Sequence, residues 1–261
     1  MEPRSGTIDR PPVTTLNPSG ASPFVLVCEH ASNYIPARYG TLGLSESELL
    51  RHIAWDIGAA DMTRGLAERL DAVAFLAGAS RLLIDCNRPL NSLTSIPEVS
   101  EIPIPGNHSI DGGERRLRAL KWFEPFHSAI SIHLDHRRAQ RQPATVIGVH
   151  SFTPVLNGVR RKMHAGVLFS DSVKFGMAVL VDLRRNSGLD IAENAPYRID
   201  AEDWTIPFHA DQRKLTGALL EIRHDGLEST AGIDTWVDRS TRALKAGWDA
   251  VGAQESSTGV A

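Results

Sequence analysis

Short, continuous runs of apolar residues alternate along this chain with longer segments of helical periodicity. Uninterrupted apolar runs are typical of strands that are buried on both faces of a sheet. The expected strands are residues 24–28, 73–76, 82–84, 145–149, 178–182 and 219–223, and the expected helices are residues 46–52, 57–70, 114–136 and 235–250. This alternation favours an α/β fold with three layers, α/β/α, around a mixed central sheet.

The spacing of two expected strands indicates that the sheet is mixed. Residues 73–76 and 82–84 are separated by only a few residues, including Gly78-Ala79-Ser80. Such a gap is too short for the crossover that parallel neighbours need, so these runs are expected to form antiparallel neighbours or one bent element. The Pro-, Ser- and Gly-containing stretch 89–113 is expected to be a long loop, and loops of that length are often functional.

The length of 261 residues is compatible with one α/β domain. We expect this domain to span residues 23–253, after an N-terminal arm at 1–22 that is rich in Pro, Ser, Thr and Gly. Residues 254–261 are expected to form a flexible tail.

Composition excludes several classes of function. The net charge of −3 gives no electrostatic reason to expect a nucleic-acid partner. No run of about 18 apolar residues predicts a membrane span, and the first residues lack the apolar segment of a secretory signal. Two cysteines outside any Cys-x-x-Cys pair make a zinc ribbon or a disulfide framework improbable. We therefore expect a cytoplasmic protein that acts on a small molecule.

Polar residues follow several of the apolar runs. Glu29-His30 follows the first run, Asp85-Cys86-Asn87-Arg88 follows residues 82–84, His150-Ser151 follows residues 145–149, and Glu221 and Arg223 lie in the last run. Ligands of open α/β sheets bind at the carboxyl ends of parallel strands. These side chains are therefore expected to converge on one site.

Two of these residues are candidate metal ligands. His30 and His150 each follow a buried run, and two imidazoles with one carboxylate are a common ligand set of catalytic zinc. We expect Asp56 to be the third ligand, since Glu29 would point to the opposite face of a strand from His30. The alternatives are that each histidine is only a hydrogen-bonded strand-end residue and that Asp56 is a helix N-cap.

The arginines near residues 81–88 are candidates for binding a carboxylate. Arginine binds carboxylates through two parallel hydrogen bonds, and an asparagine can add a third to the same group. Arg81, Asn87 and Arg88 could therefore contact the substrate. The alternative is that Asp85 forms a structural ion pair with an arginine while Asn87 lies in a turn.

Glu221 is the candidate general base. A carboxylate at the end of a buried run is costly unless it is paired or functional, and it could take a proton from an attacking water molecule. The alternative is a structural ion pair with Arg223 or Arg213. Arg223 is also a candidate substrate-binding residue.

At these positions the chain resembles the N-formylglutamate amidohydrolase family. The matching elements, in family order between about residues 24 and 247, are Glu29-His30, Trp55-Asp56-Ile57-Gly58, residues 80–89 with Asp85-Cys86-Asn87-Arg88-Pro89, residues 148–154 and residues 220–225. The resemblance implies a fold similar to zinc carboxypeptidases and aspartoacylase. It also implies hydrolysis of an amide next to a carboxylate-bearing amino acid.

The resemblance also implies roles for particular residues. Asn87 and Arg88 would bind the substrate carboxylate, Arg81 would polarise the scissile carbonyl, and Glu221 would be the base. The sequence departs from the carboxypeptidase-like pattern His-x-x-Glu, because Asn33 stands where the glutamate ligand would be.

We therefore expect a zinc-dependent hydrolase of an N-acyl amino acid such as N-formylglutamate. In this hypothesis His30, Asp56 and His150 hold the metal. One alternative is a metal-free cysteine amidohydrolase that uses Cys28 or Cys86 with His30. Another is a non-catalytic protein that binds carboxylates on the same fold.

Overall fold

A seven-stranded mixed sheet forms the centre of the protein. The computed structural model describes residues 10–185 and 188–258. The strands, in spatial order, are β1 (Val13–Leu16), β3 (Val73–Ala77), β2 (Phe24–Cys28), β4 (Thr145–Phe152), β9 (Thr216–Arg223), β7 (Ala165–Leu168) and β8 (Ile191–Glu193). Strands β3, β2, β4 and β9 are parallel, whereas β1 and the β7–β8 pair run in the opposite direction. The expected mixed α/β sheet is therefore confirmed.

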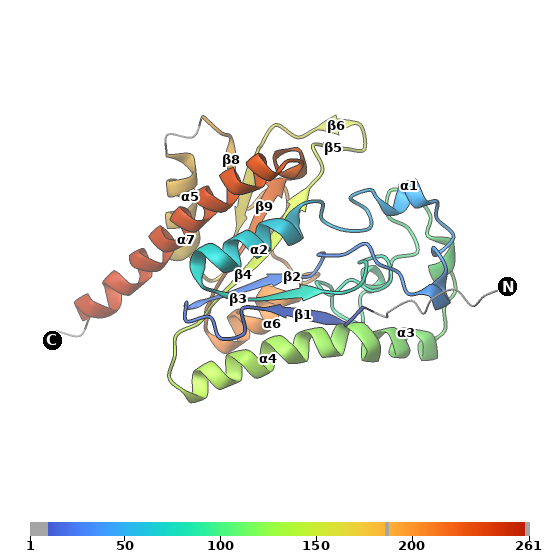
Figure 1. Ribbon diagram of the computed structural model, residues 1–261, viewed down its shortest axis with the longest axis horizontal. Helices are drawn as coiled ribbons and strands as arrows, with labels where there is room; N and C mark the ends of the chain where they lie inside the picture. Colours follow the sequence, from blue (N-terminus) through green and yellow to red (C-terminus); the bar gives the residue numbers. More distant parts are fainter. Residues whose placement is uncertain (1–9, 186–187, 259–261) are drawn as a thin grey trace.

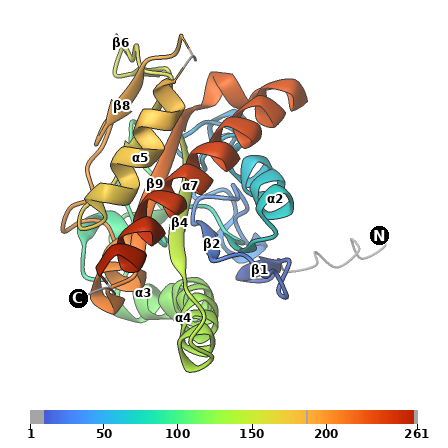
Figure 2. The same ribbon diagram turned by 90° about the vertical axis from the view of Figure 1, so that its left-hand side faces the viewer.

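Helices cover both faces of this sheet. Helices α2 (Ala59–Leu70), α5 (Val173–Arg184) and α7 (Thr230–Thr258) lie on one side, and α4 (Glu124–Ala139) lies on the other (Figure 1). Figure 2 shows the same separation after a quarter turn. The remaining helices are α1 (Glu46–Leu49), α3 (Gly112–Arg118) and α6 (Thr205–His209).

Alternate residues of each central strand pack into different cores. In β2, Leu26 belongs to the core under α2, α5 and α7, whereas Val25 and Val27 belong to the core on the α4 side. Successive strand side chains point to opposite faces, so a strand buried on both faces must be apolar throughout. This is why the largely apolar runs at 24–28, 73–76, 145–149 and 219–223 predicted strands correctly.

Two predicted strands are wrong. Residues 178–182 belong to helix α5, which buries Val179, Leu180 and Leu183 but leaves Val181 49% exposed. A short apolar run fits a buried helix as well as a strand, and the sequence pattern alone did not distinguish them.

Residues 82–84 form a buried turn and not a strand. The backbone N–H of Leu83 donates to the carbonyl oxygen of Ser80 at 2.9 Å, so its hydrogen bond is local. The antiparallel neighbour of β3 is β1, which lies within the predicted N-terminal arm. The long loop that follows includes short helical turns at Leu93–Ser95 and Pro105–Asn107.

The predicted helix at 114–136 is two α-helices, α3 and α4, joined by a π-helical segment at Ala119–Phe123. The closing helix is longer than predicted, since α7 runs to Thr258, into the segment expected to be a tail; residues 259–261 of that segment lie outside the described residues.

A small hairpin, β5 (Val155–Leu156) and β6 (Val159–Arg160), follows β4. Among the described residues, no helix combines the length and apolarity needed to cross a membrane.

Candidate active site

The site lies where the central parallel strands end. His30 follows β2 by two residues, while His150 and Glu221 lie inside β4 and β9, which extend beyond the predicted runs. His150 is the register partner of Glu221, so the two side chains leave neighbouring strands on the same face. The strand ends thus bring these three residues together.

Asp56 reaches the same place from the connection that precedes α2. Its backbone N–H donates to the carbonyl oxygen of His30 at 3.0 Å. Gly58 starts α2 with a φ of 79°, and a Cβ there would lie 2.4 Å from Cβ of Leu227. A residue with a side chain would be strained and crowded at this turn, so glycine allows α2 to begin directly after Asp56. Asp56 is therefore not the N-cap of the helix.

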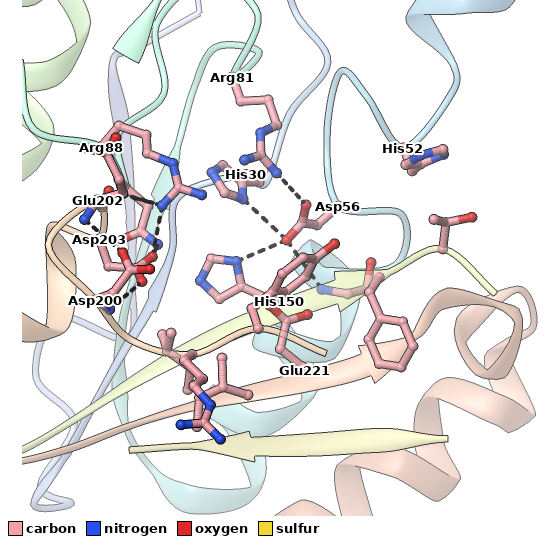
Figure 3. Close-up of a pocket in the computed structure, with 18 residues that line it drawn as sticks. His30, His52, Asp56, Arg81, Arg88, His150, Asp200, Glu202, Asp203 and Glu221 are labelled. Carbon is pink, nitrogen blue, oxygen red and sulfur yellow. Dashed lines mark hydrogen bonds and ion pairs between the residues drawn. The ribbon is translucent and has the colours of Figure 1, made fainter. Parts of the chain in front are cut away.

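His30, Asp56 and His150 form a buried cluster. The Nδ1 atoms of His30 and His150 lie 3.3 Å and 3.0 Å from Oδ2 of Asp56, and one potential ligand atom from each residue lies within 4.8 Å of the others. Figure 3 shows the three side chains pointing toward one another. This cluster consists of the three residues that the sequence predicted as metal ligands, and it could bind a metal ion.

A second carboxylate stands behind each imidazole. Nε2 of His30 lies 2.8 Å from Oδ1 of Asp85, and Nε2 of His150 lies 3.1 Å from Oε2 of Glu29. Histidines that bind metals usually donate their other ring N–H to a carboxylate or carbonyl, which fixes the tautomer. No sequence pattern pointed to this role for Glu29 and Asp85, although each stands next to a candidate site residue or motif.

The buried carboxylates around this cluster carry more negative charge than their neighbours offset. Glu29, Asp56 and Asp85 are buried, and Arg81 is their only guanidinium neighbour among the described ion pairs. If both imidazoles are neutral, three carboxylates and one guanidinium leave two negative charges. Uncompensated buried charge is costly, so the cluster either binds a cation or protonates its histidines.

The pKa shifts of His150 and Glu29 indicate which of these two states the metal-free cluster adopts. Burial by itself would lower the pKa of His150, but Glu29 and Asp56 hold it well above its usual value. Burial would raise the pKa of Glu29, but the neighbouring His150 lowers it to about 2. The protein without a metal therefore favours charged pairs here.

Arg81 spans two of the carboxylates. Its Nε and Nη2 atoms donate to Oδ2 of Asp85 at 3.0 and 2.7 Å, and Nη1 lies 3.5 Å from Oδ1 of Asp56. The structural ion pair considered for Asp85 is therefore present. The same guanidinium also lines the cavity beside the His30–Asp56–His150 cluster.

Asn87 and Arg88 meet a residue far away in the sequence. Nδ2 of Asn87 and Nη1 of Arg88 both donate to Oδ1 of Asp203, at 3.0 and 2.9 Å. Oδ1 of Asn87 accepts from the backbone N–H groups of Trp204 and Thr205 at 3.2 and 3.0 Å. The Asn87 amide is thus occupied by the 203–205 segment, whereas all hydrogen bonds described for Arg88 use Nη1 and leave its other donors for a ligand.

Glu221 is buried, and its Oε2 atom has no hydrogen-bond partner among the described residues. Burial raises the pKa of Glu221 to about 7, against the opposing effect of His150. A carboxyl group with this pKa can both accept and return a proton near neutral pH.

A cavity of about 280 Å³ connects these groups to the surface. Seven of the eight predicted site residues line it: His30, Asp56, Arg81, Asn87, Arg88, His150 and Glu221. The exception is Arg223, whose Nη1 donates to the backbone carbonyls of residues 161–163 and whose Nε donates to Asp225 at 2.8 Å. Arg223 thus supports a loop and does not face the cavity.

Arg198 also lines the cavity, and the sequence analysis did not identify it. Among the described residues it has no carboxylate partner, and its side chain is exposed. The acidic residues of the same wall already accept hydrogen bonds. Asp200 accepts from the backbone N–H of Glu202, Glu202 accepts from Ser92 and Thr94, and Asp203 accepts from Arg88. No sequence pattern connected residues 198–203 with the motif at 85–88.

The two thiols are unsuited to nucleophilic catalysis. Cys28 and Cys86 are buried and free. Burial, reinforced by nearby carboxylates, raises the pKa of each thiol well above its usual value. Because the thiolate is the nucleophile, this environment disfavours the cysteine-hydrolase alternative.

Comparison with known proteins agrees with the sequence motifs. The family model of N-formylglutamate amidohydrolase matches residues 22–227. A gene product of Agrobacterium tumefaciens of known structure is 33% identical with a TM-score of 0.88, over 92% of this chain and 96% of that one. An N-formylglutamate amidohydrolase from Ralstonia eutropha JMP134 is 17% identical with a TM-score of 0.66, over 93% of this chain and 99% of that one, and this likeness concerns the fold. No curated protein matches the sequence.

Proposed function

The chain belongs to the N-formylglutamate amidohydrolase family, and we propose that it hydrolyses the amide bond of an N-acyl amino acid such as N-formylglutamate with the help of a zinc ion. The observation that carries the metal part of this proposal is the buried His30–Asp56–His150 cluster, with a further carboxylate behind each imidazole. Two imidazoles and one carboxylate suit zinc and leave a position open for water or substrate.

The metal would be held by Nδ1 of His30, Nδ1 of His150 and a carboxylate oxygen of Asp56. Its positive charge would also offset the two net negative charges that the three buried carboxylates leave after Arg81 is counted. When bound, such an ion supplies a Lewis acid that polarises a carbonyl and lowers the pKa of water to about 7.

Glu221 is proposed as the general base and then the general acid. Its unpartnered, buried oxygen lines the cavity next to His150, where it can take a proton from the attacking water and deliver it to the leaving nitrogen. Arg81 is proposed to stabilise the negative charge that develops on the carbonyl oxygen, because its Nη1 faces the cavity beside Asp56.

The substrate carboxylate is proposed to bind the guanidinium groups of Arg88 and Arg198. Arg88 retains donors beyond Nη1, and Arg198 has no carboxylate partner within the described ranges. Asn87, whose amide is bonded to residues 203–205, is a positioning residue that fixes Asp203 and through it Arg88. Fixing the substrate in this way lowers the entropic part of the barrier.

The test combines metal analysis with activity. We expect about one zinc per chain, and N-formylglutamate hydrolysis that is lost on chelation and restored by zinc. No hydrolysis after zinc addition, with carboxylates still raising the melting temperature, would favour a non-catalytic binding protein.

The base is tested by Glu221→Gln, which should lower kcat about 100- to 10,000-fold while the zinc content stays unchanged. Glu193→Gln, on the exposed edge strand β8, is the matched control and should retain full activity. Full turnover by Glu221→Gln would show that another group transfers the proton.

A further inference from the structure

A second cavity of about 270 Å³ adjoins the catalytic one. The two cavities share part of their lining: His52, Arg81, Arg88 and Tyr197. Arg81 therefore stands at the boundary between them, and in Figure 3 it lies on the side of the His30–Asp56–His150 cluster away from Glu221. A ligand next to Arg81 can extend into either space.

The second cavity differs from the first in its chemistry. Its apolar lining residues are Ile53, Leu82, Pro97, Val99, Leu156 and the shared Tyr197. Its two acidic residues are already neutralised: Glu101 pairs with Arg51 and His52, and Asp85 pairs with Arg81. The rest of its lining is polar: His52, Arg81, Arg88, Thr94 and Ser100. The space thus suits an uncharged group that packs against the apolar side of this lining, whereas the unpartnered Arg198 faces the first cavity.

We infer that this second cavity is an acyl subsite and that the substrates carry an apolar acyl chain of several carbons. The inference rests on the proposed function, which places the scissile carbonyl beside Arg81. With the carboxylate-bearing amino acid in the first cavity, near Arg88 and Arg198, the acyl side of the amide continues past Arg81 into the second.

The volume gives the scale of the effect. Water occupies about 30 Å³ in the liquid, so 270 Å³ has room for several carbon atoms. A formyl group adds only a hydrogen beyond the carbonyl and leaves the subsite unfilled. Burying one methylene group contributes about 0.8 kcal/mol, equivalent to about fourfold in kcat/KM for a fully enclosed group. Partial enclosure reduces this to about twofold per carbon.

The experiment measures kcat/KM of the zinc-loaded protein for glutamate N-acylated with formyl, acetyl, butanoyl or hexanoyl groups. We expect kcat/KM to rise from formyl to hexanoyl, by at least tenfold in total. Hydrolysis of N-formylglutamate with equal or slower hydrolysis of every longer compound would overturn the acyl subsite and leave the proposed function intact.

A filling variant tests the position of the subsite. Val99, 64% exposed on the loop that walls the cavity, can accept a larger side chain without disturbing a core. Val99→Trp should reduce the hexanoyl-to-formyl ratio of kcat/KM at least tenfold. Val159→Trp, at a similarly exposed valine that lines neither cavity, should keep the parent ratio.

Calorimetric titration separates this inference from the proposed function. N-hexanoylglutamate should bind the protein more tightly than N-formylglutamate, and Val99→Trp should remove the difference. If no acyl glutamate is hydrolysed, the proposed function fails, but tighter hexanoyl binding would still support the subsite. Equal binding of the two compounds would overturn it.

Discussion

Removing the charge of Glu29 should weaken zinc binding, although Glu29 does not belong to the ligand cluster. The substitution Glu29→Gln keeps the size of the side chain and exchanges a carboxylate for an amide. Oε2 of Glu29 lies 3.1 Å from Nε2 of His150, whose Nδ1 faces Asp56 at 3.0 Å. The carboxylate therefore holds the tautomer of His150 that presents Nδ1 to a metal.

The loss of such a carboxylate typically lowers metal affinity about 10- to 100-fold, or about 1.4 to 2.7 kcal/mol. We expect the lower part of this range for Glu29→Gln, because the amide oxygen keeps an acceptor beside Nε2 of His150. The remaining effect comes from the lost negative charge in a buried cluster whose neutral-imidazole form carries two negative charges.

The assay is competition for zinc between the metal-free protein and a chromophoric chelator, with thermal melting to confirm folding. Glu98→Gln is the matched control, because Glu98 forms an exposed carboxylate–histidine pair with His108, outside the cavity. It should leave the zinc Kd unchanged. A Kd for Glu29→Gln within twofold of the parent, or an equal loss in the control, would refute the assigned role.

Three further predictions concern the substrate wall, the buried histidines and the core. Asp203→Asn should raise KM for N-formylglutamate without changing zinc affinity, since it releases the Arg88 guanidinium from its fixed position; steady-state kinetics and metal titration check this. Burial lowers the pKa of His127 to about 4 and that of His209 to about 2, so below about pH 6.5 the unfolded chain binds protons that the folded one does not. Each ring should therefore contribute a decrease of about 1.4 kcal/mol per pH unit to the free energy of unfolding as the pH falls toward 4. Compared with the parent in a denaturation series, His209→Gln should lose one such contribution. Phe126→Ala, at a side chain with 0% exposure, should cost about 3 to 5 kcal/mol in urea unfolding.

The sequence predicted the central parallel strands because burial on both faces leaves a local trace. A strand covered by helices on each side has few polar positions, and residues 24–28 and 146–149 show this directly. The strand predicted at 178–182 is wrong because a mostly buried helix can contain an equally short apolar run. The exposed Val181 distinguishes the helix from a buried strand, but its exposure follows from the packing of α5 and not from the local sequence. Residues 82–84 are apolar because tertiary packing buries the turn that they form, and not because they belong to a strand.

Much of the candidate site could also be predicted from the sequence, because His30, His150 and Glu221 follow or lie within strands whose ends meet at one edge of a parallel sheet. Asp56 was predicted because Glu29 would point to the opposite face of the strand from His30. Arg223 stands two residues after Glu221, but its guanidinium lies outside the cavity, on the carbonyls of residues 161–163, and the sequence carried no sign of that direction.

The sequence by itself determined the layered α/β architecture, the family and the residues of the His30–Asp56–His150 cluster. It did so because strand burial and strand-end chemistry are properties of short segments. Only the tertiary structure decided which carboxylates stand behind the imidazoles, that Asp203 fixes Arg88, and that a second cavity meets the first at Arg81. These three features depend on contacts between residues far apart in the chain. The periodicity and spacing of residues within a short segment do not indicate which distant side chain it contacts.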